Sequence, residues 1–171
     1  GYKALGAEIK YKRETYTVSA RKLHGAKFVF GNTSVTGTEA LMMAASLARG
    51  TTILKNCACE PEVVSLADFL ISCGADISGA GTPQIVIKGV RELNGGRHTT
   101  IPDRIEAGSF AILAAATGSN IKIDNCQPDD LDSLWSLFGK AGINFKIGKK
   151  SVEIYPSGKI SSVSIKTREY P

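Results

Sequence analysis

Polar residues that could bind an anion precede the first long apolar run of the chain. Residues 32–36 (NTSVT) lead into TEALMMAASLA, a composition typical of a buried helix. Backbone amides at a helix N-terminus lack intrahelical acceptors and carry partial positive charge, so they attract phosphates. Thr36 and Glu39 also have the spacing of a capping box, an ordinary way to start a helix. Spacing alone therefore leaves a ligand site and a plain helix start open.

Carboxylates supply a second candidate chemistry. Glu60 and Glu62 flank Pro61 at the start of another apolar run, and two neighbouring carboxylates can act as general acid and base. Carboxylates in a first turn also complement the helix dipole, so a purely structural role is equally open. Asp103 and Glu106 repeat the capping-box spacing before FAILAAATG, and we expect Asp103 to be an N-cap first.

The cysteines and histidines do not indicate a metal or redox centre. They are Cys57, Cys59, Cys73, Cys126, His24 and His98. Structural zinc takes about four Cys or His ligands in tetrahedral reach, and no second pair stands at a suitable spacing. We therefore expect no metal, no cofactor, and reduced thiols that pack between a strand and a helix. The glycine-rich GAGTP lacks the lysine and helix of a phosphate loop, so it predicts a turn.

The composition limits the classes of partner that we expect for this chain. The chain has 171 residues, 43% of them hydrophobic, and a net charge of +5, which describes a mildly basic globular protein. No run of Lys or Arg is long enough to indicate a nucleic-acid partner, and no segment has the apolar length of a membrane span. No secretory signal opens the sequence, so we expect a cytoplasmic protein.

One short phrase occurs three times, as LGAEI, CGADI and AGINF, and its glycines, Gly6, Gly74 and Gly142, follow at intervals of 68 residues. A constant interval indicates a structural repeat. The complete copy reads as a strand at 27–30, a helix from 36 to a C-cap at Gly50, a strand at 51–55, a helix from Pro61 to Gly74, and a hairpin of 75–78 and 84–88. The predicted unit is β-α-β-α-β-β, with helical crossovers between parallel strands.

The following copy is predicted to match element for element, with a strand at 120–124, a helix at 128–142 and a hairpin of 145–147 and 152–155. The first copy shows only its end, LGAEI and TYTVSA, and VSIKT (163–167) predicts a lone last strand. The nearly all-apolar helix 39–48 should be buried between layers. In an isolated piece of the fold, helices 39–48 and 110–116 would lose neighbours that bury them, so we expect self-association or exposed apolar surface. We expect an excised piece of a larger protein, folded as two lobes joined near residues 95–102.

Several motifs together resemble one family. SVTGTEALMMAA, EPEVVSLADFLISCGADISGAGT, IVIKGV and PDRIEAGSF are similar, in order and spacing, to the UDP-N-acetylglucosamine enolpyruvyl transferases. The resemblance implies an α/β (α+β) fold of repeated β-α-β-α-β-β units in an inverse α/β barrel. It implies that residues 1–101 belong to the sugar-nucleotide domain and residues 102–171 to the second domain. The substrates it implies are UDP-N-acetylglucosamine and, in the intact enzyme, phosphoenolpyruvate.

The resemblance also assigns residues. The nucleotide sugar would be held by Asn32, Thr33, Ser34, Val35 and Thr36, with Glu60, Glu62, Asp103, Arg104 and Glu106 as polar residues of the cleft. The catalytic loop and the phosphate-binding arginines of the family are expected outside this chain, which should be inactive alone. The implied role is the first committed step of peptidoglycan synthesis, with its keywords of cell shape, cell division and cell cycle. A shikimate-pathway enolpyruvyl transferase and a non-catalytic repeat scaffold remain alternatives, and self-association of the piece is expected.

Overall fold

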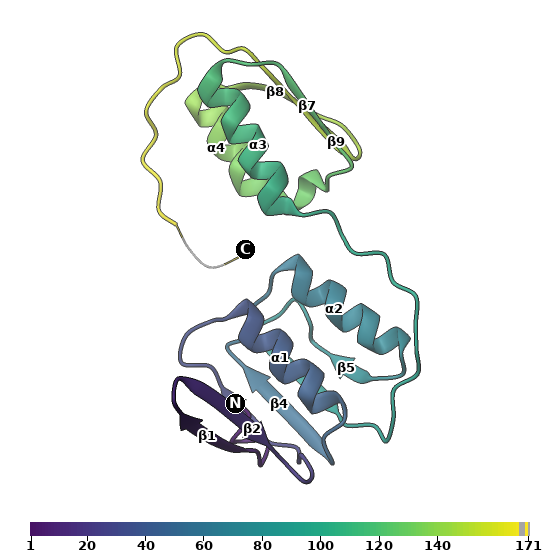
Figure 1. Cartoon of the computed structure of the whole chain (residues 1–171). Coiled ribbons are helices and arrows are strands. Elements are labelled where there is room, and N and C mark those ends of the chain that lie inside the picture. The colour runs from purple at the N-terminus through teal and green to yellow at the C-terminus, as the bar shows by residue number, and fades with distance from the viewer. Residues whose placement is uncertain (168–169, 171) are drawn as a thin grey trace. The chain divides into compact units, whose positions relative to one another are not determined.

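The computed structural model describes residues 1–167 and Tyr170. The chain forms two compact units, one of Gly1–Thr99 with Tyr170 and one of Thr100–Thr167 (Figure 1). Each unit has its own sheet and its own core. The expected division after residue 101 into two domains of a longer enzyme stays a prediction.

The first unit is built on a four-stranded sheet in the order β3-β4-β6-β5. Its elements are β3 (Lys27–Val29), α1 (Val35–Ser46), β4 (Thr51–Lys55), α2 (Pro61–Ser72), β5 (Asp76–Ser78) and β6 (Gln84–Lys88). The strands β3 and β4 are parallel, whereas β6 is antiparallel to both β4 and β5. The predicted β-α-β-α-β-β unit is therefore confirmed.

Both helices of this unit pack on one face of the sheet (Figure 1). Alternate residues of the two central strands point to that face, and Leu54, Ile85 and Ile87 are fully buried there. Period-two alternation is what a sheet with one covered face requires. Met42 and Val63 supply the helical side of the same core.

The three repeat glycines share one backbone conformation. The φ angles of Gly6, Gly74 and Gly142 are +92°, +101° and +78°, in the left-handed region that residues with a side chain rarely adopt. Gly74 follows the end of α2, and Gly142 caps α4 (Asp132–Ala141). After Gly6 comes the hairpin of β1 (Glu8–Lys12) and β2 (Thr15–Ser19), which forms a separate two-stranded sheet. The interval of 68 residues thus marks one turn geometry used three times.

The second unit repeats the β-α-β-α-β-β pattern from its first helix onward. It contains α3 (Arg104–Thr117), β7 (Ile121–Asp124), a 3-10 turn η1 (Pro128–Leu131), α4, β8 (Asn144–Ile147) and β9 (Ser151–Tyr155), with sheet order β7-β9-β8. Trp135 donates its indole N–H to the Pro128 carbonyl at 2.7 Å and stacks on Phe145, so the predicted core role of this helix is confirmed.

Two predicted strands are absent from this region. The second unit has no counterpart of β3 before α3, so the copies do not match element for element among the described residues. VSIKT at 163–167 forms no strand either. Backbone groups in a strand need a partner ladder, and no strand of residues 1–167 pairs with this segment. Hydrophobic alternation alone could not reveal that the partner was lacking.

The central helices leave part of their apolar surface exposed, which confirms the expectation that they lose neighbours in this piece; burial between two layers is not observed. Met43 and Leu47, at the end of α1, are 48% and 52% exposed. On α3, Phe110, Ile112 and Leu113 are exposed to a similar extent. The helices of each unit pack on one sheet, so each helix has a layer to pack on along one side only.

We predict that this exposed apolar face drives self-association. Burying a few hundred Å² of apolar surface at about 25 cal/mol per Å² corresponds to several kcal/mol. Sedimentation velocity over a concentration series should show species heavier than the 18.1 kDa monomer, together with binding of a hydrophobic dye. Met43→Lys should weaken association, whereas Ile165→Lys, a control at an exposed apolar residue outside the helices, should not. A dye-negative monomer at every concentration would contradict the prediction.

The segment that leaves the first unit is held against α2. The Asn94 amide donates to the Cys73 carbonyl at 2.8 Å, and Ser65 Oγ lies 3.0 Å from His98 Nε2. The His98 ring also contacts Phe69, with ring centroids 5.5 Å apart. A side chain at Gly96 would come within 2.9 Å of the Cys73 sulfur, which shows how closely the backbone approaches. The linker is therefore anchored as far as His98.

We predict that His98→Ala releases this segment. Loss of the ring and its hydrogen bond removes about 0.5–1.5 kcal/mol of local stabilisation, which should speed hydrogen exchange of the Asn94 amide roughly threefold to tenfold. Exchange measured by NMR, with Arg97→Ala as the control at the neighbouring exposed residue, checks it. Equal exchange rates in the two variants would show that His98 does not anchor the segment.

Candidate functional site

The turn between β3 and α1 contains the residues predicted to hold a ligand. Ser34 is the N-cap of α1, and its hydroxyl oxygen accepts the Gly37 amide at 3.1 Å. The predicted capping box of Thr36 and Glu39 is therefore wrong, because the helix begins at Val35 and both residues lie inside it. Ser and Thr are both good caps, and the glutamate three residues after Thr36 favoured the wrong one.

Glycine at position 37 makes this cap possible. A Cβ there would lie 2.9 Å from Ser34 Oγ and 3.1 Å from the Phe30 ring, so a larger residue would displace the serine hydroxyl. As the first residues of the helix, Val35 and Thr36 have amides with no intrahelical acceptor. The turn thus presents backbone donors at the positive end of the helix, an arrangement suited to an anionic or carbonyl-rich ligand.

A second turn, between β4 and α2, is bonded to the first. Asn56 Nδ2 donates to the Phe30 carbonyl at 3.1 Å, and the Thr33 hydroxyl donates to Asn56 Oδ1 at 3.4 Å. The Ala58 amide donates to the hydroxyl oxygen of the fully buried Thr38, on α1, at 3.1 Å. Side-chain bonds thus connect the two turns on both sides of the α1 N-terminus.

Three carboxylates lie close together beside these turns. Burial raises the pKa of Glu39, and the charges of Glu62 and Glu60 raise it further. Because the folded-state pKa is raised, ionised Glu39 lowers stability at neutral pH, and protonation at lower pH relieves that cost. Glu60 is the N-cap residue of α2, only 9% exposed, and its Oε2 has no hydrogen-bond partner among the described residues. Glu62 lies in the first turn, where its charge complements the helix dipole.

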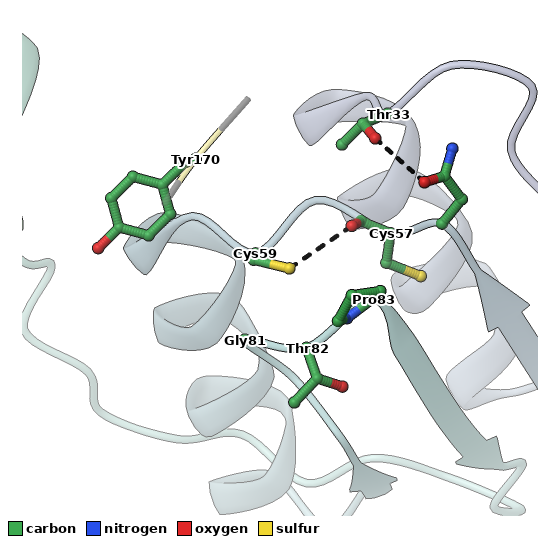
Figure 2. Close-up of a pocket in the computed structure, with 8 residues that line it drawn as sticks. Thr33, Cys57, Cys59, Gly81, Thr82, Pro83 and Tyr170 are labelled. Atoms are coloured by element: carbon green, nitrogen blue, oxygen red, sulfur yellow. Dashed lines mark hydrogen bonds between the residues drawn. The ribbon is translucent and has the colours of Figure 1, made fainter. Parts of the chain in front are cut away.

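A cavity of about 400 Å³ opens beside the same turns (Figure 2). Residues from the turns after β3 and β4 and from the β5–β6 turn line it, together with Tyr170: Thr33, Asn56, Cys57, Cys59, Gly81, Thr82 and Pro83. Burial raises the pKa of Cys57 to about 11, and burial followed by the charge of Glu60 raises that of Cys59. Both thiols are therefore protonated at neutral pH and are poor nucleophiles.

The predicted residues of the second unit lie at the N-terminus of α3. Asp103 is the N-cap, as predicted, and its Oδ1 accepts the amides of Ile105 and Glu106 at 2.8 and 3.0 Å. Arg104 begins the helix and Glu106 lies in its first turn. A cavity of about 330 Å³ adjoins Asp103, Glu106 and Asn125. The start of α3 and the end of β7 line it.

The structure therefore groups the predicted residues in two sets. Residues 32–36 join Glu60 and Glu62 in the first unit, whereas Asp103, Arg104 and Glu106 belong to the second. The sequence analysis missed Asn56, Thr38 and Glu39 as parts of the first set. The NC dipeptide shared by the turns after β4 and β7 was an available signal, because Asn56 and Asn125 both have positive φ.

Among the described residues, neither a metal-binding cluster nor a membrane-spanning helix is found. Within residues 1–167 and Tyr170, no three His, Cys, Asp or Glu side chains gather into a group that could hold a metal ion. The helices of the same residues are too short or too polar to cross a membrane.

Comparison with known proteins defines the class to which this fold and site belong. The profile of the EPSP synthase family (3-phosphoshikimate 1-carboxyvinyltransferase) matches residues 1–171. The chain belongs to this family of enolpyruvyl transferases.

Individual relatives differ in their names from the family profile and in their similarity to this chain. The chain is 44% identical, over its whole length, to the UDP-N-acetylglucosamine 1-carboxyvinyltransferases of Xylella fastidiosa strains 9a5c and M23, and it spans 41% of their length. Its fold resembles the enolpyruvyl transferase NikO from Streptomyces tendae, with a TM-score of 0.80 and 19% identity over 91% of this chain and 40% of that one. It also resembles EPSP synthase from Acinetobacter baumannii, with a TM-score of 0.67 and 18% identity over 96% and 40%.

We predict that Ser34→Ala destabilises the first unit by about 1 kcal/mol, because the Gly37 amide loses its acceptor. Thr36→Ala, at an exposed position inside the helix, should stay within roughly 0.5 kcal/mol of the original. Urea unfolding followed through NMR signals of the first unit measures both. A larger loss of stability in Thr36→Ala than in Ser34→Ala would contradict this prediction and would indicate that Thr36 caps the helix.

Proposed function

We propose that this chain forms part of an enzyme that transfers enolpyruvate from phosphoenolpyruvate to the 3-hydroxyl of UDP-N-acetylglucosamine, releasing phosphate. The observation that carries the proposal is the 44% identity over the whole chain to carboxyvinyltransferases that are named for this sugar nucleotide. The enzyme would act in peptidoglycan synthesis in the cytoplasm, and thereby in cell shape and division.

In this proposal the first unit supplies one wall of the nucleotide-sugar site. Asn32, Thr33, Ser34, Val35 and Thr36 would hold UDP-N-acetylglucosamine, mainly through backbone groups. Two features support this: the open amides at the start of α1, and a side chain at position 35 that has no polar atom to offer. Glu60 and Glu62 beside this turn, and Asp103, Arg104 and Glu106 in the second unit, would face the cleft.

The chain by itself should not turn over substrate. Transfer of enolpyruvate needs cationic groups around the phosphate and a proton donor to the enol carbon. The thiols beside the first turn have raised pKa values and lie next to carboxylates, an environment that repels the phosphate of phosphoenolpyruvate. We propose that both requirements are met by segments of the longer enzyme.

A shikimate-pathway role is the second candidate, and the family match and the likeness to EPSP synthase support it. The sequence identities favour the sugar nucleotide as substrate. The chain is 18% identical to the EPSP synthase of similar fold and 44% identical to the UDP-N-acetylglucosamine transferases. A scaffold that binds a protein and no substrate is the third. Ligand titration separates the three.

We predict weak binding of UDP-N-acetylglucosamine, with the largest NMR shifts at the amides of residues 32–36. Phosphoenolpyruvate and shikimate 3-phosphate should produce no saturable shifts. Affinity should be low because one wall provides few of the groups that must be positioned together. Shifts confined to the unit that contains Trp135, or saturation by shikimate 3-phosphate instead, would contradict the assignment.

A matched pair of variants tests whether the backbone does the binding. Proline at the first helical position removes one amide without breaking the helix, and the extended Ser34 backbone (φ −145°, ψ 119°) accepts a following proline. Val35→Pro should raise the Kd about tenfold, the effect of one lost hydrogen bond to the ligand. Val35→Ala keeps the amide and should bind like the original chain.

A further inference from the structure

The Asn56 side chain bonds both to the residue that directly follows β3 and to a residue later in the β3–α1 turn. Its Nδ2 donates to the carbonyl of Phe30, where the turn leaves β3, and its Oδ1 accepts the hydroxyl of Thr33, directly before the cap. Figure 2 shows the Thr33 bond as a dashed line at the rim of the cavity. The side chain therefore links the residue after β3 to the residue before the helix cap.

Asparagine fits this position for two separate reasons. The backbone of residue 56 is left-handed, with φ +57°, a conformation that Asn tolerates better than most residues with a side chain. One amide group also supplies a donor and an acceptor at the same time, and the turn needs both. Aspartate would keep the acceptor and lose the donor, and glycine would keep the backbone and lose both bonds.

The bond from Ala58 to Thr38 reinforces the same arrangement from the other side of Ser34. Thr38 is fully buried on α1, so the first turn of the helix cannot shift relative to the β4–α2 turn without breaking this bond. The residues between Phe30 and Thr38 are thus tied at both ends, and their free amides point in a defined direction before any ligand arrives. Such preorganisation lowers the ordering cost of binding.

We propose that Asn56 is a positioning residue for the nucleotide sugar, acting through the Asn32–Thr36 turn and not by touching the ligand itself. The inference rests on the proposed function, because it assumes that this turn binds UDP-N-acetylglucosamine. It adds to the proposed site a residue that follows β4, whereas residues 32–36 follow β3. It also explains why the β4–α2 turn contains an asparagine.

The repeat provides a matched control for the test. Asn125 follows β7 as Asn56 follows β4, and its φ of +54° is nearly the same. Asn56→Gly and Asn125→Gly should therefore have similar effects on backbone strain and on the freedom of the unfolded chain. The two variants differ in whether the nucleotide-sugar turn loses its side-chain bonds.

The first measurement is made on the free 171-residue chain by hydrogen exchange. Asn56→Gly should speed exchange of the Gly37 amide, which Ser34 accepts, roughly threefold to tenfold, the effect of one lost hydrogen bond. Asn125→Gly should leave this rate unchanged. Unchanged exchange in Asn56→Gly would overturn the positioning role, whether or not any ligand binds.

The second measurement is the Kd for UDP-N-acetylglucosamine. Asn56→Gly should raise it about threefold to tenfold, and Asn125→Gly should not change it. Asn56→Asp should resemble the glycine variant, because the carboxylate cannot donate to the Phe30 carbonyl. Equal Kd values in the two glycine variants would overturn the proposal, whereas absence of binding by the original chain would overturn the proposed function and leave the exchange result to decide the positioning of the turn.

Discussion

The parallel pairing of β3 with β4 is the constraint on which the first unit depends. A helix must cross over between two parallel strands, so α1 runs back across the sheet and the carboxyl ends of both strands meet at one edge. The turns that follow these strands then lie next to the starts of α1 and α2. Only this adjacency allows Asn56 to reach Phe30 and the Ala58 amide to reach Thr38. The candidate site is a consequence of the topology.

The same topology accounts for the surface of the chain. Each unit places its helices on one face of one sheet, so Met42 on the covered side of α1 is buried whereas the next residue, Met43, is turned away and half exposed. A helix that is apolar all round normally has neighbours on every side. The chain spans 41% of the length of its carboxyvinyltransferase relatives, and in our proposal the remainder of the enzyme covers these faces. The exposed apolar surface and the incomplete site then have one explanation.

The sequence predicted most of the fold because hydrophobic periodicity and glycine spacing report local geometry. Gly6, Gly74 and Gly142 revealed the repeat, since a left-handed backbone selects glycine wherever the turn recurs. The missed features depend on partners far along the chain. The cap is Ser34 and not Thr36, and Gly37 leaves room for it beside the Phe30 ring. Asn56 could not be assigned to the site, because its bonds reach Phe30 across 26 positions, and the segment at 163–167 lacked a pairing strand that no local pattern could reveal.

The central claim is that the turn before α1 contacts the nucleotide sugar. Isotope-edited NOE spectra of the ¹⁵N-labelled chain, saturated with UDP-N-acetylglucosamine, test it most directly because they report proximity and not induced change. The account predicts cross-peaks between uridine or ribose protons of the ligand and the amide protons of Ser34 and Val35. Cross-peaks only to residues of the second unit, such as Ile123 or Asn125 beside its cavity, would contradict it.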